Sequence, residues 1–264
     1  MDVLGGADRG GVPALRLARC VNQPDNAAMP TDEERRRLSG AVFRGDGAEI
    51  VEILARRPWP ADRLQLIGDG LLIALGAGVE GAPPLVAECV TALRARGWTG
   101  DPELADGLES LAKKGSPPLP PLPVDLAELA ESLEGDPVYG GGRIDLRTGE
   151  VWPQAAIDYG VEEGELDEDD EDPDRWLRID CVGSRDGYRD MQWFVDDLDD
   201  PEIADRLSIA LQGRGAFRRF RDVLSRWDEL VGRWHSFSDD RKRGRARSWL
   251  ADQGYAAMPR ILPD

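Results

Sequence analysis

The sequence predicts a mainly α-helical protein with two domains. We expect an all-helical N-terminal domain and an α+β C-terminal domain with a small antiparallel sheet of about three strands. Three observations predict this class: apolar residues recur at helical spacing through residues 31–114, a proline-rich segment follows at 115–123, and strand-like alternation appears only after it. The length of 264 residues is sufficient for two ordinary domains.

The first residues carry no periodic pattern. Residues 1–30 are rich in Gly, Ala and Pro, which predicts an irregular segment. Thr31 is followed three positions later by Glu34, and this pair is a typical capping box. We therefore expect a helical domain over residues 31–114 that begins at this box.

The helical domain shows clear start and stop signals. Gly97 follows a helical pattern and is a typical C-cap, and Asp101 precedes Pro102 as a typical N-cap. The first helix carries Leu38, Val42 and Phe43. The helices expected after it are Ala48–Arg57, Pro60–Leu75, Pro84–Arg96 and Pro102–Lys113.

A proline-rich segment separates the two expected domains. Residues 115–123 contain Pro117, Pro118, Pro120, Pro121 and Pro123. Such a run favours an extended polyproline conformation. Proline-rich segments also bind partners, but a spacer is the commoner role between folded units. We therefore expect a linker at 115–123 and a second domain over residues 124–264.

The second domain opens with a helix and a hairpin. Residues 125–133 place their leucines on one side of a short helix. Residues 143–152 alternate on both sides of a turn, and Gly149 can adopt the positive φ that a tight hairpin requires. This segment therefore predicts two paired strands.

A charged loop and a third strand follow the hairpin. Residues 162–174 hold ten acids in thirteen positions, and like charges at this density favour an extended loop. Trp176–Val182 then alternates, with Leu177, Ile179 and Cys181 on one face. We expect this segment to complete a sheet of about three strands.

The stretch from Asp174 to Tyr255 continues with four amphipathic helix patterns and holds five of the eight tryptophans. Ser184 or Asp186 starts the first helix, and Asp199–Pro201 starts the second. The third and fourth patterns carry Phe217, Phe220, Leu224, Trp227, Leu230, Val231, Trp234 and Phe237, before a final helix at Arg243–Gln253. So many rings predict a core here, with a recognition face beside it.

The charge and the cysteines limit the classes of function. A net charge of −18 argues against a general binder of nucleic-acid phosphates and against adhesion to anionic membranes. Cys20, Cys89 and Cys181 lie far apart and indicate no disulfide framework. The chain shows neither a secretory signal pattern nor a stretch apolar enough to cross a bilayer, so we expect a cytoplasmic protein.

A catalytic or cofactor signature is not recognisable in the sequence. The single histidine, His235, has no partner pattern of a triad or a zinc site. Within the acidic run, an EF-hand that started at Asp167 would need Gly and Glu where Asp172 and Arg178 stand. The glycines form neither a dinucleotide fingerprint nor a phosphate-binding loop. We therefore expect no cofactor and no bound metal.

Arginines are the strongest remaining signal. One basic cluster, Arg214, Arg218, Arg219 and Arg221, flanks Phe217 and Phe220, and a second spans residues 241–247. Both clusters allow three interpretations: internal pairing with acids such as residues 196–205, docking of an acidic partner, or contact with nucleic-acid phosphates. Internal pairing is favoured, and contact with nucleic acid is the least favoured, because the neighbouring rings fall on the apolar sides of their helices. The residues expected to bind a partner are Arg185, Tyr188, Arg214, Arg218, Arg219 and Arg221.

The C-terminal half also resembles a known family. The segments that carry the resemblance are Val124–Glu131, Asp145–Val151, Gly183–Met191, Gly213–Leu224 and Arg245–Leu250. In this order they resemble uncharacterised protein family 0158, a bacterial family, over residues 124–255. The resemblance implies the same boundary and the same α+β class. It implies no activity, because the family has no established function.

Three hypotheses of function follow. The first is a non-enzymatic interaction or regulatory protein that binds a protein partner through an arginine and aromatic face of the C-terminal domain. The second is a nucleic-acid-associated protein, or a phosphate mimic, that uses the local basic clusters or the acidic surface. The third is a hydrolase-type enzyme built from carboxylates and arginines, for example Asp186 and Asp190 beside Arg185 and Arg189.

Overall fold

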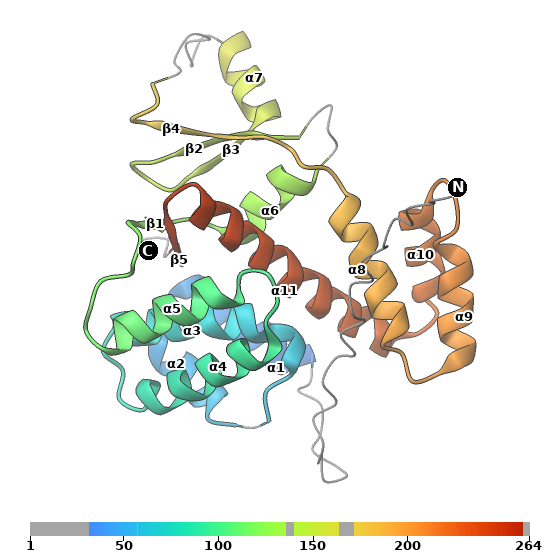
Figure 1. The fold of residues 1–264 in the computed structure, drawn as a ribbon, viewed down its shortest axis with the longest axis horizontal. Coiled ribbons are helices and arrows are strands. Elements are labelled where there is room, and N and C mark those ends of the chain that lie inside the picture. Colours follow the sequence, from blue (N-terminus) through green and yellow to red (C-terminus); the bar gives the residue numbers. More distant parts are fainter. Residues whose placement is uncertain (1–31, 57, 136–139, 164–171, 261–264) are drawn as a thin grey trace, which may run out of the picture.

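One long helix, α11 (Asp228–Asp252), runs through the middle of the molecule and contacts most of its other parts (Figure 1). The computed structural model describes residues 32–56, 58–135, 140–163 and 172–260. The expected irregular segment 1–30, the cap at Thr31 and most of the acidic run lie outside these residues. Within them the protein is mainly helical, with an all-helical N-terminal part and an α+β C-terminal part, as its sequence predicts.

The N-terminal part consists of helices only among the described residues. Its elements are α1 (Asp32–Arg44), α2 (Gly47–Leu54), the 3-10 turn η1 (Ala61–Arg63), α3 (Leu64–Gly76), α4 (Ala82–Arg96) and α5 (Asp101–Ala112). Their apolar faces surround α3, whose Ile67 and Leu71 are almost fully buried. Gly97 ends α4 in the left-handed conformation, which confirms the predicted cap.

The predicted N-cap at Asp101 is wrong. Gly100 occupies the cap position in the left-handed conformation, and Asp101 is the first residue of α5. Its side chain is fully buried, and its carboxylate accepts hydrogen bonds from the backbone N–H of Trp98 at 2.8 Å and from Gln65 at 2.9 Å. The N-cap pattern therefore marked a carboxylate that binds residues from two other segments.

The proline-rich segment is partly a strand. Residues 121–123 form β1 (Pro121–Pro123), which pairs in parallel with β5 (Ala256–Met258) near the C-terminus. Gly149 of the hairpin lies against this segment with φ +72°, and a Cβ there would come within 1.6 Å of the Pro123 carbonyl oxygen. Residues 121–123 are therefore extended and lie against both the hairpin and the C-terminal strand β5.

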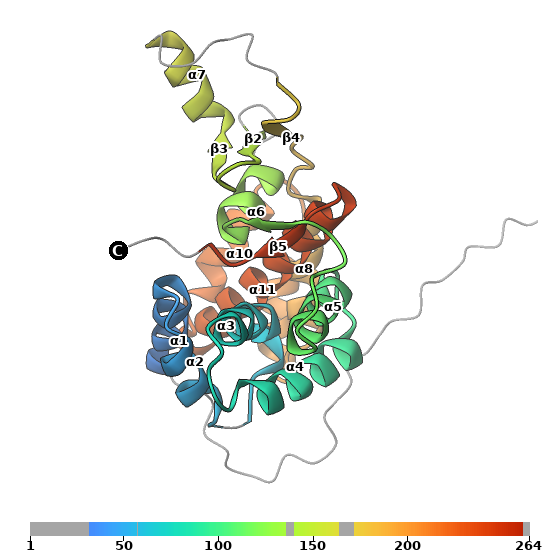
Figure 2. The same cartoon turned by 90° about the vertical axis from the view of Figure 1, so that its left-hand side faces the viewer.

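The predicted antiparallel sheet is present, with strand order β3-β2-β4. Its strands are β2 (Gly142–Asp145), β3 (Val151–Pro153) and β4 (Trp176–Ile179). The buried side chains of its inner face pack on α6 (Leu126–Glu134) and on the end of α11. A helix that the sequence did not predict, α7 (Gln154–Glu162), follows β3 and lies with the sheet at one end of the molecule (Figure 2).

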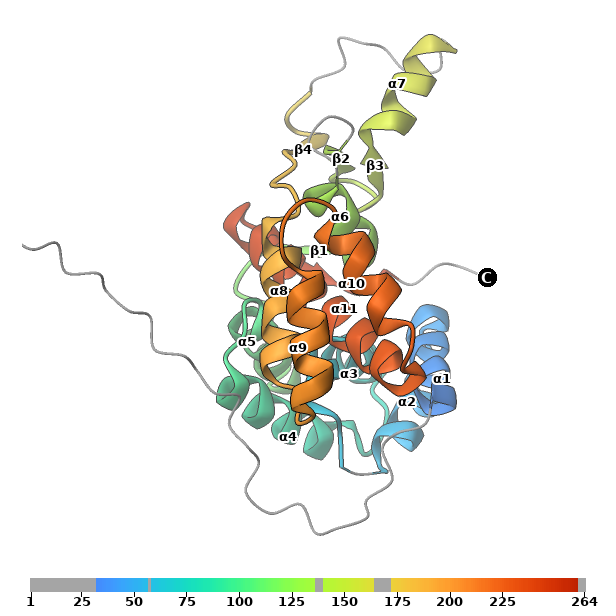
Figure 3. The same cartoon turned by 90° about the vertical axis from the view of Figure 1, so that its right-hand side faces the viewer.

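The remaining helices form an aromatic core beside α11. They are α8 (Arg185–Asp196), α9 (Pro201–Ala210) and α10 (Ala216–Leu224), which stand side by side in Figure 3. Phe194 and Phe220 are almost fully buried and meet the ring of Trp234 edge-on, with ring centres 5.3 Å and 4.9 Å away. The rings of this part therefore stabilise its core, as predicted.

The final helix is longer than expected. The sequence indicated a separate helix at Arg243–Gln253, whereas α11 is continuous from Asp228. Its first half packs Trp234 and Phe237 into the aromatic core, and its second half packs Ala246 and Leu250 under the sheet. One helix therefore connects two apolar cores of the C-terminal part.

Candidate functional site

The predicted site residues come from the first turn of α8 and from the segment that leads into and through α10. Arg185 is the first residue of α8 and is exposed, and Tyr188 lies one turn later. The Tyr188 hydroxyl donates a hydrogen bond to the Leu211 carbonyl at 3.0 Å, and its ring centre lies 6.5 Å from that of Phe217. Gly187 lies against the Phe217 ring. The first turn of α8 thus meets the start of α10.

The arginines around α10 divide into two groups. Arg219 has a structural role: its guanidinium donates to the carbonyls of Ala210 at 3.1 Å, Gln212 and Arg214, and so closes the turn after α9. Arg218 pairs with Asp222 at 3.7 Å on the same helix, and 86% of the Arg218 side chain is exposed. Arg214 and Arg221 are also exposed.

Phe217 is exposed among these arginines. The sequence placed its ring with Phe220 on the buried side of the helix, but 41% of Phe217 is open to solvent, whereas Phe220 is fully buried. This expectation was wrong because Phe217 lies in the first turn of α10, where Gly187 and Tyr188 of α8 lie beside its ring and leave much of it exposed. We name the surface formed by Arg185, Arg214, Phe217, Arg218 and Arg221 the Arg/aromatic face.

Most arginines of the second basic cluster, residues 241–247, form ion pairs inside the protein. Arg241 and Arg245 both bind Asp190, at 3.0 Å and 2.7 Å, and Arg245 also binds Glu134. Arg247 binds Asp69 on α3, and the residues between 196 and 205 are not its partners. The cluster therefore stabilises α11 and leaves little positive charge for a ligand.

Asp186 and Asp190, the two carboxylates that suggested an enzyme, lie in different surroundings. Asp190 is 1% exposed and bound by two arginines, whereas Asp186 lies at the surface and pairs with Arg189 at 2.9 Å. Asp190 therefore holds two arginines inside the protein, whereas Asp186 stays at the surface. Among the described residues, no group of three or more His, Cys, Asp or Glu side chains is placed to hold a metal ion.

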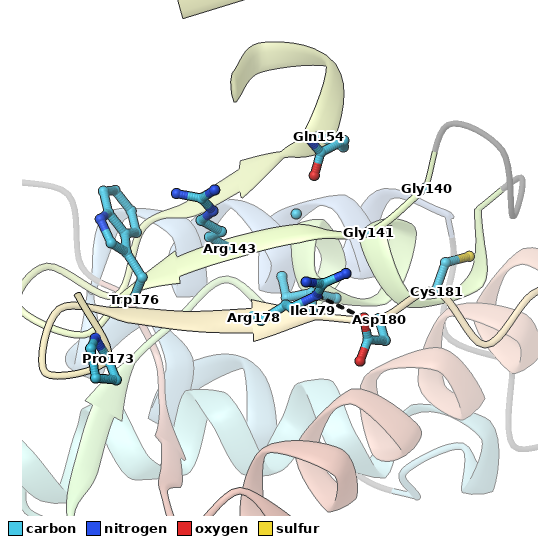
Figure 4. A pocket seen from close by; sticks show the side chains of 11 residues that line it. Gly140, Gly141, Arg143, Gln154, Pro173, Trp176, Arg178, Ile179, Asp180 and Cys181 are labelled. Carbon is cyan, nitrogen blue, oxygen red and sulfur yellow. Dashed lines mark hydrogen bonds and ion pairs between the residues drawn. The ribbon is translucent and has the colours of Figure 1, made fainter. Parts of the chain in front are cut away.

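A second surface, which the sequence analysis missed, is a hollow of about 760 Å³ on the outer face of the sheet (Figure 4). Arg143 of β2, Trp176 and Arg178 of β4, and Gln154 at the start of α7 line it. Arg178 pairs with Asp180 at 3.0 Å, and both side chains are at least 80% exposed. We name these four lining residues the sheet-face site.

A signal for the sheet-face site was present in the predicted strands. In the hairpin, Arg143 and Trp152 alternate with the inward residues Ile144 and Val151, so both point to the outer face. A tryptophan beside an arginine on the outer face of a sheet is a signal of a binding surface. The sequence analysis used this alternation only to place the strands.

Among the described helices, none combines the length and the apolar character needed to span a bilayer.

Comparison with known proteins agrees with the C-terminal resemblance. The model of an uncharacterised protein family (UPF0158) matches residues 127–260, about half of the chain. A curated relative from Pseudomonas aeruginosa, a protein named for the same family, is 29% identical over 144 residues. These residues are 54% of this chain and 91% of the relative. No solved structure matches the chain. The matched region contains α8, α10, α11 and the sheet, and the chain therefore belongs to uncharacterised protein family 0158.

Proposed function

We propose that this protein is a non-enzymatic interaction protein that binds an acidic segment of a protein partner through its Arg/aromatic face. The observation that carries the proposal is the exposed ring of Phe217, which lies among arginines that are not consumed in the core. An exposed apolar side chain surrounded by charged groups is typical of a binding site.

The spacing on α10 supports a single continuous surface. Phe217 and Arg221 lie four positions apart on α10 and so share one side of the helix, with Arg218 next to Phe217 and Arg214 in the turn before the helix. Phe220 and Leu224, further along the same helix, are almost fully buried. A partner can therefore contact the arginines and the ring together without disturbing the core.

The chemistry of the face favours a carboxylate-rich partner with an apolar side chain. Guanidinium groups bind carboxylates in a planar, two-pronged geometry, and the Phe217 ring offers an apolar contact between them. The net charge of −18 opposes an acidic partner at long range. At physiological salt, however, charges beyond roughly 8 Å are largely screened, so the local arginines determine the contact.

A capture experiment with matched variants tests this function. The purified chain, immobilised, is incubated with cell extract in steps of increasing salt, and bound proteins are quantified by mass spectrometry. We expect the same acidic proteins to be retained by the wild type and lost from the variant R214E/R218E/R221E. Retention should also fall as salt increases, because the ion pairs between the arginines and the carboxylates of the partner would be exposed to solvent.

The control variant changes charge equally at another place. R56E/R147E/R206E reverses three exposed arginines outside the face, so its net charge equals that of the face variant. We expect this control to retain the partners. Equal capture by wild type and face variant, or equal loss in both variants, would contradict a site on α10.

Two broader proposals accompany this function. We propose a domain boundary within residues 115–123, supported by the separate apolar cores of the helical part and of the C-terminal part. We also propose a cytoplasmic location. Its support is that the two described cysteines, Cys89 and Cys181, are both free thiols, as a reducing compartment favours.

A further inference from the structure

The outer face of the sheet places two arginines directly beside each other. Arg143 of β2 and Arg178 of β4 are direct partners in the antiparallel register, so their side chains emerge next to each other on the same face. Like charges directly opposite each other destabilise a strand pair. Residues that contradict a local folding rule are expected at functional positions.

Both arginines already interact within the molecule. Asp180 pairs with Arg178, but this pair is almost fully exposed, and exposed pairs contribute little to stability. Arg143 is half-buried and already has an interaction within the molecule, so a ligand has to compete for its guanidinium. The described side chains that line the hollow still include two arginines and one carboxylate.

An aromatic ring and an amide complete the site. Trp176 precedes Arg178 by two positions on β4, so it lies on the same face of the sheet. Its ring meets Trp152 edge-on, with ring centres 6.1 Å apart, and the Arg175 guanidinium lies 4.3 Å from its ring centre. Gln154 begins α7 on the opposite side of the hollow, and Figure 4 shows Arg143 and Trp176 on the side of the sheet that faces it.

We propose that the sheet-face site binds a small ligand that joins a phosphate group to a flat ring, as a nucleoside phosphate does. Arg143 and Arg178 would hold the phosphate, since paired guanidiniums match its geometry. Trp176 would contact the ring, because indole groups stack on bases of any type. A hollow of about 760 Å³ lies within the size range of small-molecule sites.

The proposal concerns a different surface from the Arg/aromatic face. The hollow lies on the sheet, and none of its lining residues belongs to α8 or α10. Its ligand is a small molecule, whereas the partner proposed for α10 is a protein. Either proposal can therefore fail while the other holds.

Titration with adenosine monophosphate, adenosine and inorganic phosphate tests the site. Binding to the full chain is followed by calorimetry and by tryptophan fluorescence. We expect adenosine monophosphate to bind at least about tenfold more tightly than either fragment, because only it engages the arginines and the ring together. No binding of adenosine monophosphate, or equal affinity for inorganic phosphate, overturns the proposal.

Variants locate the binding. R178Q removes an exposed guanidinium, so the fold should be unchanged, and we expect its affinity for adenosine monophosphate to fall about tenfold or more. W176L should bring the affinity for adenosine monophosphate down to that for inorganic phosphate. R218Q on α10 is the control and should bind as the wild type does. Unchanged affinity in both R178Q and R143Q would show that the ligand binds elsewhere and overturns the proposal.

Discussion

Arg96 at the end of α4 and Asp240 in the middle of α11 form an ion pair of 2.5 Å although 144 positions separate them in the sequence. The same guanidinium holds Asp101 at 2.6 Å, and all three side chains are at most 6% exposed. The Asp240 carboxylate also accepts the backbone N–H of Gln65 at 2.8 Å. Arg96 therefore connects the helical part to the helix at the centre of the C-terminal part.

Replacement of Arg96 by leucine should destabilise the whole protein. The change leaves Asp101 and Asp240 buried without their guanidinium, and a broken buried pair costs roughly 3–5 kcal/mol. Arg94, two positions earlier on α4, is a matched control because it pairs with Asp106 and Glu109 at the surface. Urea unfolding followed by circular dichroism should show a large loss of unfolding free energy for R96L and a small loss for R94L. Equal losses would contradict a buried connection.

The stability of the protein should depend on the protonation of Asp240. Burial raises the pKa of this carboxyl to about 6, although the Arg96 guanidinium and the Gln65 N–H oppose the shift. In the unfolded chain its pKa is about 4, so the folded state binds the proton more tightly. The stability that the folded state gains from the proton on Asp240 is therefore complete below about pH 4, and it is lost as the pH rises through about 6. A shift of about two units corresponds to roughly 3 kcal/mol at most.

Comparison with D240N isolates this contribution from that of other groups. The free energy of unfolding of both proteins is measured by urea titration between about pH 4 and about pH 7. We expect the wild type to lose stability relative to D240N as the pH increases over this range. A difference that does not change with pH would show that Asp240 titrates alike in the folded and unfolded states.

Patterns along the sequence were sufficient to predict the helix ends and turns that depend on neighbouring residues. Gly97 ends α4, Asp200 caps α9 by accepting two backbone N–H groups, and Gly149 turns the hairpin. Each of these roles is set by neighbours within a few positions, so a pattern along the chain can reveal it.

The remainder depends on partners that are distant in the sequence. Parallel pairing of β1 with β5 joins two three-residue strands from opposite ends of the C-terminal half, and one of them is mostly proline. Internal pairing was expected for the cluster that contains Arg247, but its partners Gln65 and Asp69 lie 182 and 178 positions away and were not identified. The exposure of Phe217 was predicted wrongly and the sheet-face site was missed, since packing against another element decides which side chains remain open.

Replacement of Gly244 by alanine should separate α11 from the loop before α5. A Cβ at Gly244 would lie 2.2 Å from the Thr99 carbonyl oxygen, which is backbone and cannot turn away. Overpacking of this kind costs about 1–3 kcal/mol. The control is Gly107 in α5, where a Cβ meets nothing within 4 Å and alanine should stabilise the helix by about 0.5–1 kcal/mol. Thermal unfolding of G244A and G107A should therefore shift in opposite directions.

Phe217 and Phe220 lie one turn apart on α10 and should differ in what they contribute. Phe220 is fully buried and meets the Phe194 and Trp234 rings with centres 6.4 Å and 4.9 Å away. F220A should therefore cost roughly 3–5 kcal/mol of unfolding free energy. Phe217 is 41% exposed, so F217A should cost less than about 1 kcal/mol and should weaken capture of the acidic partner.

The two measurements together separate folding from binding on one helix. Urea unfolding reports the loss of core packing, and salt-dependent capture reports the loss of the Arg/aromatic face. A stable F217A that still captures the partner would leave the exposed ring without a role in binding. An F220A as stable as the wild type would mean that α10 does not depend on this ring, and the face that α10 carries would then lack its rigid support.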